Sequence, residues 1–230
     1  MSRPFVIINV AASADGKIDT LERRGAAISS ARDKQRVDEL RAGVDAVMVG
    51  GRTLHDEDPR LTVKSEALRE RRQAEGLPAN PAKVAVASRL QLKPDCRFLS
   101  AGPARILLFT SPQTMTEQLD MLRLHGAEVH IQKEQRINLE QVLSFLKEAG
   151  IQRLMVEGGA TLNAALLSLG LADEISIYVA PLIFGGEAAP TLAGGRGFPL
   201  DQAISLRLIA SEQWEDGGVL LHYQVLSPAP

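Results

Sequence analysis

A carboxylate followed by two glycines stands where an apolar run gives way to a helical pattern. The stretch reads VEGGATLN, and in it Glu157 is followed by Gly158 and Gly159. Adjacent glycines cost backbone entropy on folding, which indicates that something approaches the backbone closely. The N–H groups and positive dipole end at the start of a helix suit a phosphate or pyrophosphate. A tight strand-to-helix turn without a ligand is an equal alternative.

Glu157 would close its strand at the carboxyl end, where ligands bind in open α/β sheets. A carboxylate that accepts hydrogen bonds from a neighbouring loop is the competing interpretation. The glycines do not form the pattern G-x-G-x-x-G, so the sequence does not predict a Rossmann dinucleotide site.

The stretch DAVMVGGRTLHDEDPRLTVK repeats this arrangement between residues 45 and 64. A buried strand would end at Gly50 and Gly51, and Thr53 in the following helical turn is placed to donate to a phosphate. His55 has no cysteine or second histidine close by in the sequence, so we interpret it as a surface residue. No metal site is predicted.

In the stretch NVAASADGKID, a strand runs into Asp15-Gly16, which is a strong turn signal. The simplest role for Asp15 is to form this turn. Asn9 lies inside the strand, and a buried amide needs partners, either neighbouring backbone or a ligand. Neither a G-x-S-x-G nucleophile nor a zinc deaminase or protease motif is present, which disfavours hydrolase and zinc chemistry.

Apolar runs that alternate with helical patterns would position these residues. Several runs are continuous in Val, Ile and Leu, which is typical of parallel strands covered on both faces. The predicted strands are Phe5–Ala11, Ala46–Val49, Lys83–Ala87, Arg105–Phe109, Glu128–Ile131, Arg153–Val156, Glu174–Ala180, Ser205–Ile209 and Val219–Val225.

Helices are predicted between the strands from caps and from apolar spacing. Ser30 would cap one that runs to about Arg41, and Asn138 would cap one that Gly150 stops. The other predicted helices are Pro112–His125, Thr161–Leu169 and an exposed, charge-rich insertion within Lys64–Gly76. The β-α-β order, followed by strands alone after Glu174, predicts an α/β fold with a largely parallel sheet and an antiparallel C-terminal end.

Composition narrows the class of protein. The chain has 230 residues, of which 45% are hydrophobic and 23% charged, as in ordinary globular proteins. A net charge of −2 gives no reason to expect a nucleic acid or a membrane as partner. The apolar stretches are far shorter than the ~20 residues of a membrane span, and no clear signal peptide precedes them. Cys96 is the single cysteine, which excludes an internal disulfide. A cytoplasmic protein is expected.

Three stretches, taken in order, resemble a known family. They are AASADGKI, DAVMVGGRTLHDEDPRLT and VEGGATLNAALLSLGLADEISIYVAPLIFGG, with VASRLQL as a weaker fourth. They are similar to the reductase of riboflavin biosynthesis, which is the C-terminal domain of RibD-type bifunctional proteins and also occurs alone. The resemblance implies one reductase domain over residues 1–230 with the fold of dihydrofolate reductase. This fold is a three-layer sandwich with a mostly parallel central sheet and antiparallel C-terminal strands.

The resemblance also implies an activity, which is the NADPH-dependent reduction of a ribosylamino-pyrimidine 5′-phosphate to its ribitylamino form. Glu157 is the implied catalytic residue and also binds the substrate. The implied cofactor residues are Thr53, Glu57, Ser88, Gly158, Gly159, Ala160, Thr161 and Leu162. The other implied substrate residues are Asn9, Arg41, Leu61 and Lys64. A homodimer is expected, with a small molecule as substrate.

Three positions depart from the family pattern. Position 57 is Glu where Asp is common, position 64 is Lys where some members have Arg, and Gly25 stands where a substrate-binding serine is expected. A lysine cannot bind a phosphate with the two-pronged geometry of arginine. Another NADPH reductase of this fold, acting on a pterin-type substrate, and a non-catalytic nucleotide-binding protein are the alternatives. The residues do not decide between a 2-amino and a 2-oxo pyrimidine.

Overall fold

The computed structural model describes residues 2–226, which divide into two compact units. The first unit comprises Gln35–Met155 with residues 2–4, and the second comprises Phe5–Lys34 with residues 156–226. The nine strands form a mixed sheet, with the order β5-β4-β3-β2-β6 in the first unit and β1-β7-β9-β8 in the second. The predicted α/β class, mostly parallel with antiparallel C-terminal strands, is confirmed.

The strands of the first unit are short and almost continuously buried. Parallel pairing joins β2 to β3, β3 to β4 and β4 to β5. Residues of β2, β3 and β4 are buried on both faces, which explains their uninterrupted apolar sequences. Their bounds agree with prediction to within one residue: β2 is Ala46–Gly50, β3 Ala82–Val86, β4 Ile106–Thr110, β5 Glu128–Ile131 and β6 Arg153–Val156.

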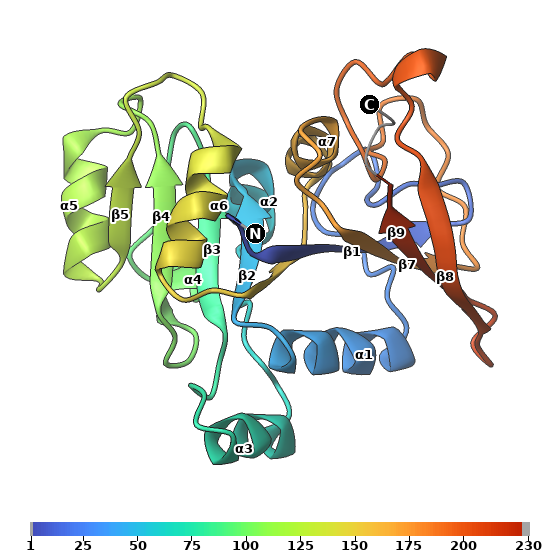
Figure 1. Cartoon of the computed structure of the whole chain (residues 1–230), viewed down its shortest axis with the longest axis horizontal. Helices are drawn as coiled ribbons and strands as arrows, with labels where there is room; N and C mark the ends of the chain where they lie inside the picture. The colour runs from blue at the N-terminus through green and yellow to red at the C-terminus, as the bar shows by residue number, and fades with distance from the viewer. Residues whose placement is uncertain (1, 227–230) are drawn as a thin grey trace. The chain divides into compact units, whose positions relative to one another are not determined.

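Helices cover both faces of these strands. On one face, Leu54, Phe98 and Leu122 from three helices pack in one core with alternate residues of β2, β3 and β4. On the other face lies α6 (Figure 1), and its Phe145 contacts the rings of Phe109 on β4 and His130 on β5. The helices are α1 Ala31–Ala42, α2 Gly51–Glu57, α3 Glu66–Ala74, α4 Arg97–Ser100, α5 Thr116–Leu124 and α6 Leu139–Glu148. The first unit thus has helix, sheet and helix layers.

The predicted helix caps are present, but one predicted helix start is wrong. The side chains of Ser30 and Asn138 accept from the N–H groups of Asp33 and Gln141. α5 begins at Thr116 instead of Pro112. The hydroxyl of Thr114 accepts from the N–H of Leu90 at 2.9 Å, and this tertiary bond holds the preceding residues in a turn.

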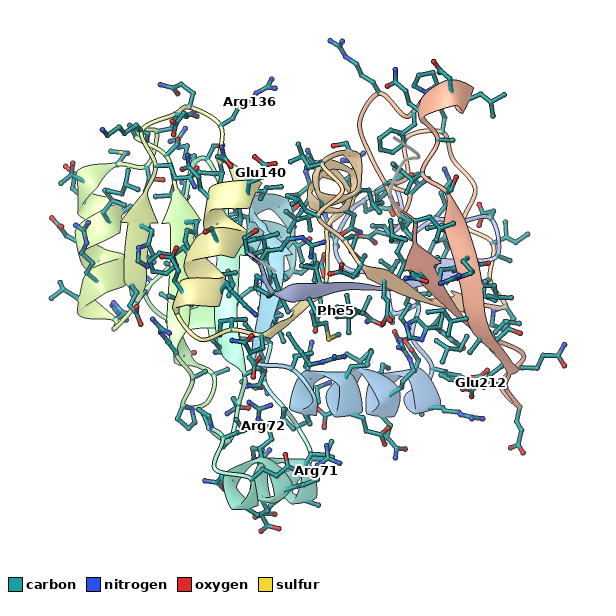
Figure 2. The ribbon with its side chains drawn as sticks, viewed as in Figure 1. Phe5, Arg71, Arg72, Arg136, Glu140 and Glu212 are labelled. Carbon is teal, nitrogen blue, oxygen red and sulfur yellow. The ribbon has the colours of Figure 1, made fainter. Side chains whose placement is uncertain are left out.

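The charged insertion α3 is less exposed than the sequence suggested. Arg72 is only 1% exposed, whereas its neighbour Arg71 is exposed (Figure 2). The guanidinium of Arg72 donates to the carbonyl oxygens of Ala42 and Val44, both at 2.8 Å, and to Pro78. Burial lowers the pKa of Arg72. Arg72 therefore joins α3 to the C-terminal end of α1 and to the segment that follows it.

The second unit combines one parallel and two antiparallel strand pairings. β1 pairs with β7 in parallel, and β9 pairs with both β7 and β8 in antiparallel orientation. β1 and β8 extend beyond their predicted ends, whereas β7 and β9 match. Their bounds are β1 Phe5–Ser13, β7 Glu174–Ala180, β8 Leu206–Gln213 and β9 Val219–Val225, with helix α7 at Ala160–Ser168 and a 3-10 turn at Leu200–Gln202. Every residue of the edge strand β8 is exposed.

The second unit contains a small aromatic core. Tyr178 and Trp214 stack with ring centroids 5.2 Å apart, together with Ile28 and Ala180.

Among residues 2–226, no helix is both long and apolar enough to cross a membrane. The same residues contain no group of three or more His, Cys, Asp or Glu placed to hold a metal ion.

Candidate functional site

The glycine pair of the second unit stands immediately before α7. Gly158 has φ +90°, in the left-handed region that favours glycine, and the peptide bond between Gly158 and Gly159 is cis. Gly159 is the N-cap residue with φ −83°, which any residue can adopt. Backbone conformation therefore explains the first glycine but not the second. Because Gly159 has no side chain, it leaves the first turn of α7 without a side-chain cap.

Asn163, one turn into α7, is wholly buried and fastens a distant loop to the helix. Its amide nitrogen donates to the carbonyl oxygen of Leu192 at 2.9 Å. Its amide oxygen has no hydrogen-bond partner among residues 2–226. Nearby, the N–H of Gly194 donates to the carbonyl of Ala160 at 3.0 Å, and a side chain at Gly194 would meet Ala160. The loop thus packs closely against the first turn of α7.

The turn at Asp15 does more than reverse the chain. Its carboxylate accepts from the Ser13 hydroxyl at 2.6 Å and from the N–H groups of Gly185 and Phe184 at 2.8 and 3.2 Å. The Ser13 hydrogen bond, with these backbone N–H groups, lowers the pKa of Asp15. Asp15 therefore joins the turn after β1 to the loop after β7.

A second set of contacts brings the same two segments together. The N–H of Ile18 donates to the carbonyl of Pro190 at 2.9 Å, and Lys17 forms a bridge with Thr191. The ammonium of Lys17 also donates to the carbonyl of Ala189. The ADGK part of the first sequence stretch is therefore adjacent, within the second unit, to the IFGG end of the third stretch and to the loop that follows it.

The two expected substrate residues of this unit are Glu157, which follows β6, and Asn9, which lies within β1. Glu157 is half-buried and directly follows β6, as predicted. Asn9 is buried within β1, and its Cα partner on β7 is Ser176. Both residues have interaction partners within the protein. Their predicted contacts with a ligand remain predictions.

In the first unit, the expected cofactor residues follow the carboxyl ends of β2 and β3. A side chain at Gly51 would fall 2.7 Å from Cβ of Ala87, so close strand packing accounts for that glycine. Thr53 is buried on α2, whereas Glu57 is exposed at its end. Ser88 follows β3. The glycine argument therefore holds more strongly at residues 158–159 than at residues 50–51.

A buried group of hydroxyls fixes the backbone of Ser88. The carbonyl oxygen of Ser88 accepts from the hydroxyls of Ser111 at 2.7 Å and Thr110 at 3.3 Å. The Thr110 hydroxyl also lies 2.6 Å from that of Thr114. These hydroxyls follow β4, and the pairing of β3 with β4 places them beside Ser88.

Arg41, Leu61 and Lys64 also belong to the first unit. Arg41 donates to the carbonyl oxygen of Thr62 at 3.1 Å, two residues before the exposed Lys64. The buried carboxylate of Asp38 accepts from the N–H of Lys64 at 2.6 Å and so fixes that segment to α1. Leu61 has φ +51° and no exposed side-chain surface. The predicted substrate contact of Leu61 remains a prediction.

Comparison with known protein families gives one match over nearly the whole chain. The family of the RibD C-terminal domain matches residues 4–220. The chain belongs to the RibD C-terminal domain family.

Two curated relatives in this family have the same name, and the match spans most of each. A "2,5-diamino-6-ribosylamino-4(3H)-pyrimidinone 5′-phosphate reductase" of Archaeoglobus fulgidus is 45% identical over 85% of this chain and 89% of its own length. A reductase of the same name from Methanothermobacter thermautotrophicus is 39% identical over 90% of both chains. The chain is therefore similar to these reductases along most of their sequence.

Solved structures show the same fold. A pyrimidine reductase-like protein of Corynebacterium diphtheriae has a TM-score of 0.81, with 22% identity, over 97% of this chain and 92% of its own. The chain covers 59% of Acinetobacter baumannii RibD, with a TM-score of 0.80 and 24% identity. Enterococcus faecalis dihydrofolate reductase, complexed with NADP(H), has a TM-score of 0.51 at 13% identity over 97% of both chains. The dihydrofolate-reductase-like fold predicted for this RibD-family chain is thus confirmed.

The departure at Gly25 has a structural explanation. Gly25 adopts φ +79° in a loop that is organised around the buried carboxylate of Asp19. Asp19 accepts from the N–H groups of Thr20, Gly25 and Ala26 at 2.7 to 3.0 Å. A serine at position 25 would have to adopt a conformation that L-residues rarely take.

Sequence reasoning missed several residues that fix the loops and the backbone around the candidate site. They are Asp19, the carboxylate bonds of Asp15, Asn163, and the hydroxyls of Thr110 and Ser111. Only Asn163 carried a usable signal, because it is an amide on a face of α7 where its neighbours Leu162, Leu166 and Leu167 are buried.

Proposed function

We propose that this protein is an NADPH-dependent reductase that acts on 2,5-diamino-6-ribosylamino-4(3H)-pyrimidinone 5′-phosphate and forms its ribitylamino product. The observation that carries this proposal is the 45% identity with the Archaeoglobus fulgidus reductase over most of both chains. A third relative of the same name, from Aquifex aeolicus, is 35% identical over 90% of this chain. Reduction of the sugar is the chemistry that this name implies.

The substrate phosphate is assigned to two cations of the first unit. Arg41 contacts the segment that leads to Lys64, and both side chains carry the positive charge that a phosphate requires. Leu61 and the side chains of Asn9 and Glu157 are assigned to the rest of the substrate. The Asp38 carboxylate supports this assignment, since it fixes the backbone of Lys64.

The residues present fit a dinucleotide phosphate. At residues 158–159, the first turn of α7 has no side-chain cap, so its backbone N–H groups are available as donors to a phosphate. We assign Gly158 through Leu162 to the cofactor in the second unit and Thr53, Glu57 and Ser88 in the first. NADPH, when bound, supplies the hydride that reduces C1′ of the sugar.

Glu157 is assigned to the opening of the ribose ring. In this step the C1′–O4′ bond breaks, O4′ gains a proton, and the glycosidic nitrogen forms a double bond to C1′ while it loses its own proton. A carboxylate beside the sugar can accept one proton and return another. Its place directly after β6 is where α/β sheets present such groups.

A turnover assay tests the proposal with two substrates. Purified protein is given NADPH and either the 2-amino or the 2-oxo pyrimidine phosphate, and the absorbance of NADPH is followed. We expect a higher kcat/KM for the 2-amino compound, as the names of the relatives indicate. Turnover of dihydrofolate, or of neither pyrimidine, would overturn the proposal. A cytoplasmic homodimer is also proposed, on the family resemblance alone.

A further inference from the structure

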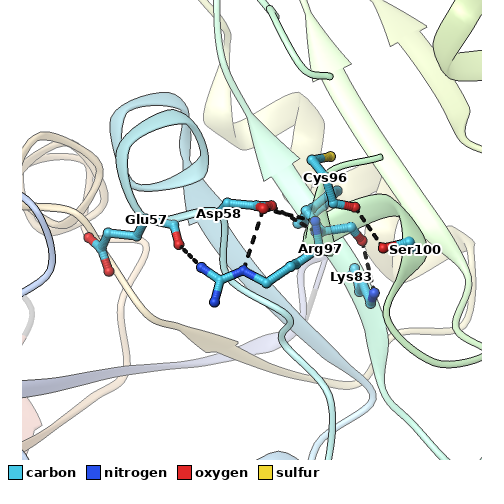
Figure 3. A network of polar contacts seen from close by, with 7 residues as sticks. Glu57, Asp58, Lys83, Cys96, Arg97 and Ser100 are labelled. Carbon is cyan, nitrogen blue, oxygen red and sulfur yellow. Dashed lines mark hydrogen bonds and ion pairs between the residues drawn. The ribbon is translucent and has the colours of Figure 1, made fainter. Parts of the chain in front are cut away.

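The end of α2 is held by residues that come from much later in the chain. Glu57 is the last residue of α2, and its carbonyl oxygen accepts from Nη2 of Arg97 at 2.6 Å. Asp58, the next residue, has φ +43° and terminates the helix. Figure 3 shows the carboxylate of Glu57 pointing away from Arg97 while its carbonyl oxygen faces the guanidinium. Arg97 thus fixes the backbone of Glu57 and leaves its side chain directed elsewhere.

Asp58 in turn caps α4, the helix that carries Arg97. Its two carboxylate oxygens accept from the N–H groups of Arg97 and Phe98 at 2.8 and 2.9 Å. Cys96 occupies the N-cap position of α4 and makes no side-chain cap bond, so Asp58 supplies the missing acceptor. The Arg97 Nε atom lies 3.5 Å from the same carboxylate. The two residues therefore hold each other's backbones in a reciprocal arrangement.

The opposite end of α4 is anchored in the buried sheet. The ammonium of Lys83 on β3 donates to the carbonyl oxygens of Phe98 at 2.8 Å and Ala101 at 2.5 Å. Lys83 has no exposed surface, so its position is set by the core of the first unit. The short helix α4 therefore connects β3 to the end of α2 through hydrogen bonds (Figure 3).

The ion pair between Arg97 and Asp58 does not by itself explain this arrangement. The side chains of Arg97 and Asp58 are 55% and 31% exposed, and ion pairs this exposed contribute little to stability. The contact of Arg97 with Glu57 is to its main chain, whereas the carboxylate of Glu57 points away. The arrangement therefore fixes the backbone from which the side chain of Glu57 extends.

We propose that Asp58 and Arg97 are positioning residues for Glu57 and set its carboxylate for the nucleotide cofactor. The proposal rests on the proposed function, in which Glu57 contacts NADPH. Neither residue touches the cofactor in this account. Both act through the backbone of Glu57, so their loss should weaken cofactor binding and leave the binding of the pyrimidine phosphate unchanged.

The test measures the Kd of NADPH by fluorescence titration, together with kcat and the KM of each substrate. Arg97→Ala is expected to raise the Kd of NADPH about tenfold, equal to about 1.4 kcal/mol. Arg97→Lys, which keeps a cation, and Asp58→Asn, which keeps one acceptor oxygen, should have smaller effects. kcat at saturating NADPH and the KM of the pyrimidine should stay within about twofold of the wild type.

Arg105→Ala is the matched control. Arg105 makes an exposed bidentate pair with Glu128 at the amino ends of β4 and β5, whereas the proposed cofactor residues of this unit follow the carboxyl ends of β2 and β3. It should leave the Kd of NADPH unchanged. Thermal unfolding of each variant identifies any that is not folded, and the two conservative variants then carry the test.

A double-mutant cycle separates positioning from general damage. If Arg97 acts through Glu57, Arg97→Ala should not weaken NADPH binding further in a Glu57→Ala background. Additive effects of the two changes, or wild-type NADPH affinity in either single variant, would overturn the inference while pyrimidine turnover by the wild type still upholds the proposed function. A wild-type protein that binds no NADPH would overturn both.

Discussion

At the scale of single residues, adjacent positions that share one amino acid type have different requirements. Gly158 needs its positive φ, whereas Gly159 lies where any residue can lie. A side chain at Gly158 would meet Asn163 only at ordinary contact distances of 3.8 to 4.0 Å. Substitutions at the two glycines should therefore separate a conformational cost from a ligand-binding cost.

We predict that Gly159→Val loses most NADPH affinity while its stability stays near that of the wild type. The branched side chain would occupy the place where a phosphate approaches the start of α7, but the backbone need not change. Gly158→Ala should instead lower the free energy of unfolding by about 1–2 kcal/mol through its left-handed backbone. NADPH titration and urea denaturation measure the two effects. Unchanged NADPH binding by Gly159→Val would show that no phosphate lies there.

Lys64→Ala is predicted to raise the KM of the phosphorylated pyrimidine about 10- to 100-fold. A charge-assisted hydrogen bond is worth roughly 1.5–3 kcal/mol, and the Kd of NADPH should barely change. The loss should disappear with a substrate that lacks the 5′-phosphate. Arg71→Ala, which removes an exposed cation from the same charged segment, is the control. Equal KM values for the two variants would place Lys64 among the solvated charges of that segment.

At the scale of elements, α4 shows how a four-residue helix can be ordered. It is too short to be stable by itself, but a carboxylate holds its first N–H groups and an ammonium its last carbonyls. Burial lowers the pKa of that ammonium, on Lys83, to about 8. The neutral amine retains two N–H donors for the two carbonyl acceptors. Deprotonation therefore need not release the helix.

We predict that the contribution of Lys83 to stability increases with pH. Between about pH 8 and 10.5, the unfolded chain keeps a proton that the folded protein has released, so unfolding becomes less favourable as pH rises. Below about pH 8 both states hold the proton, and the gain is absent. The stability of the wild type relative to Lys83→Met should increase by up to about 3 kcal/mol across this range.

Urea denaturation of both proteins between pH 7 and 10.5 measures this difference. The comparison with Lys83→Met is needed because Tyr178 has the opposite effect. Burial raises the pKa of Tyr178, so the folded protein loses stability when the pH is high enough to ionise this tyrosine in the unfolded chain. A difference between the two proteins that stays constant with pH would show that Lys83 titrates normally.

At the scale of the whole molecule, the elements were predictable where a local pattern decides them. β5, β6, β7 and β9 have their predicted bounds because turn signals or polar residues interrupt their apolar runs. The start of α5 and the burial of Arg72 depend on partners elsewhere in the chain, which no local periodicity encodes. The same holds for Asp58 and Arg97, which are far apart in sequence.

The candidate site was predictable in a different way. Glu157 at the end of a strand and the glycines before a helix followed from the pattern of residues. The assignments of Arg41, Ser88 and Lys64 came from the family resemblance, because an isolated cation or hydroxyl has no distinguishing spacing. Their supports, such as the hydroxyls around Ser88, became visible only when β3 and β4 were paired.

The exposed edge strand leads to a prediction about assembly. Leu208 and Ile209 on β8 are each 51% exposed, and an edge strand with apolar side chains favours pairing with another chain. We predict that the wild type sediments as a dimer and that the double substitution Leu208→Glu with Ile209→Glu yields monomers. Leu124→Glu, at an 86% exposed leucine on α5, should leave the dimer intact. A double variant that remains dimeric would place the interface elsewhere.

The second unit is assembled from both ends of the chain, which has a consequence during synthesis. The N–H of Val6 on β1 donates to the carboxylate of Asp173 across a separation of 167 positions. A ribosome that adds 5–20 residues per second needs roughly 8–33 s to cover that distance. Throughout this interval the apolar strand β1 has no β7 beside it, while the segments of the first unit emerge in one continuous stretch. The nascent chain therefore exposes an unpaired, aggregation-prone strand near its N-terminus, which is the kind of segment that chaperones bind.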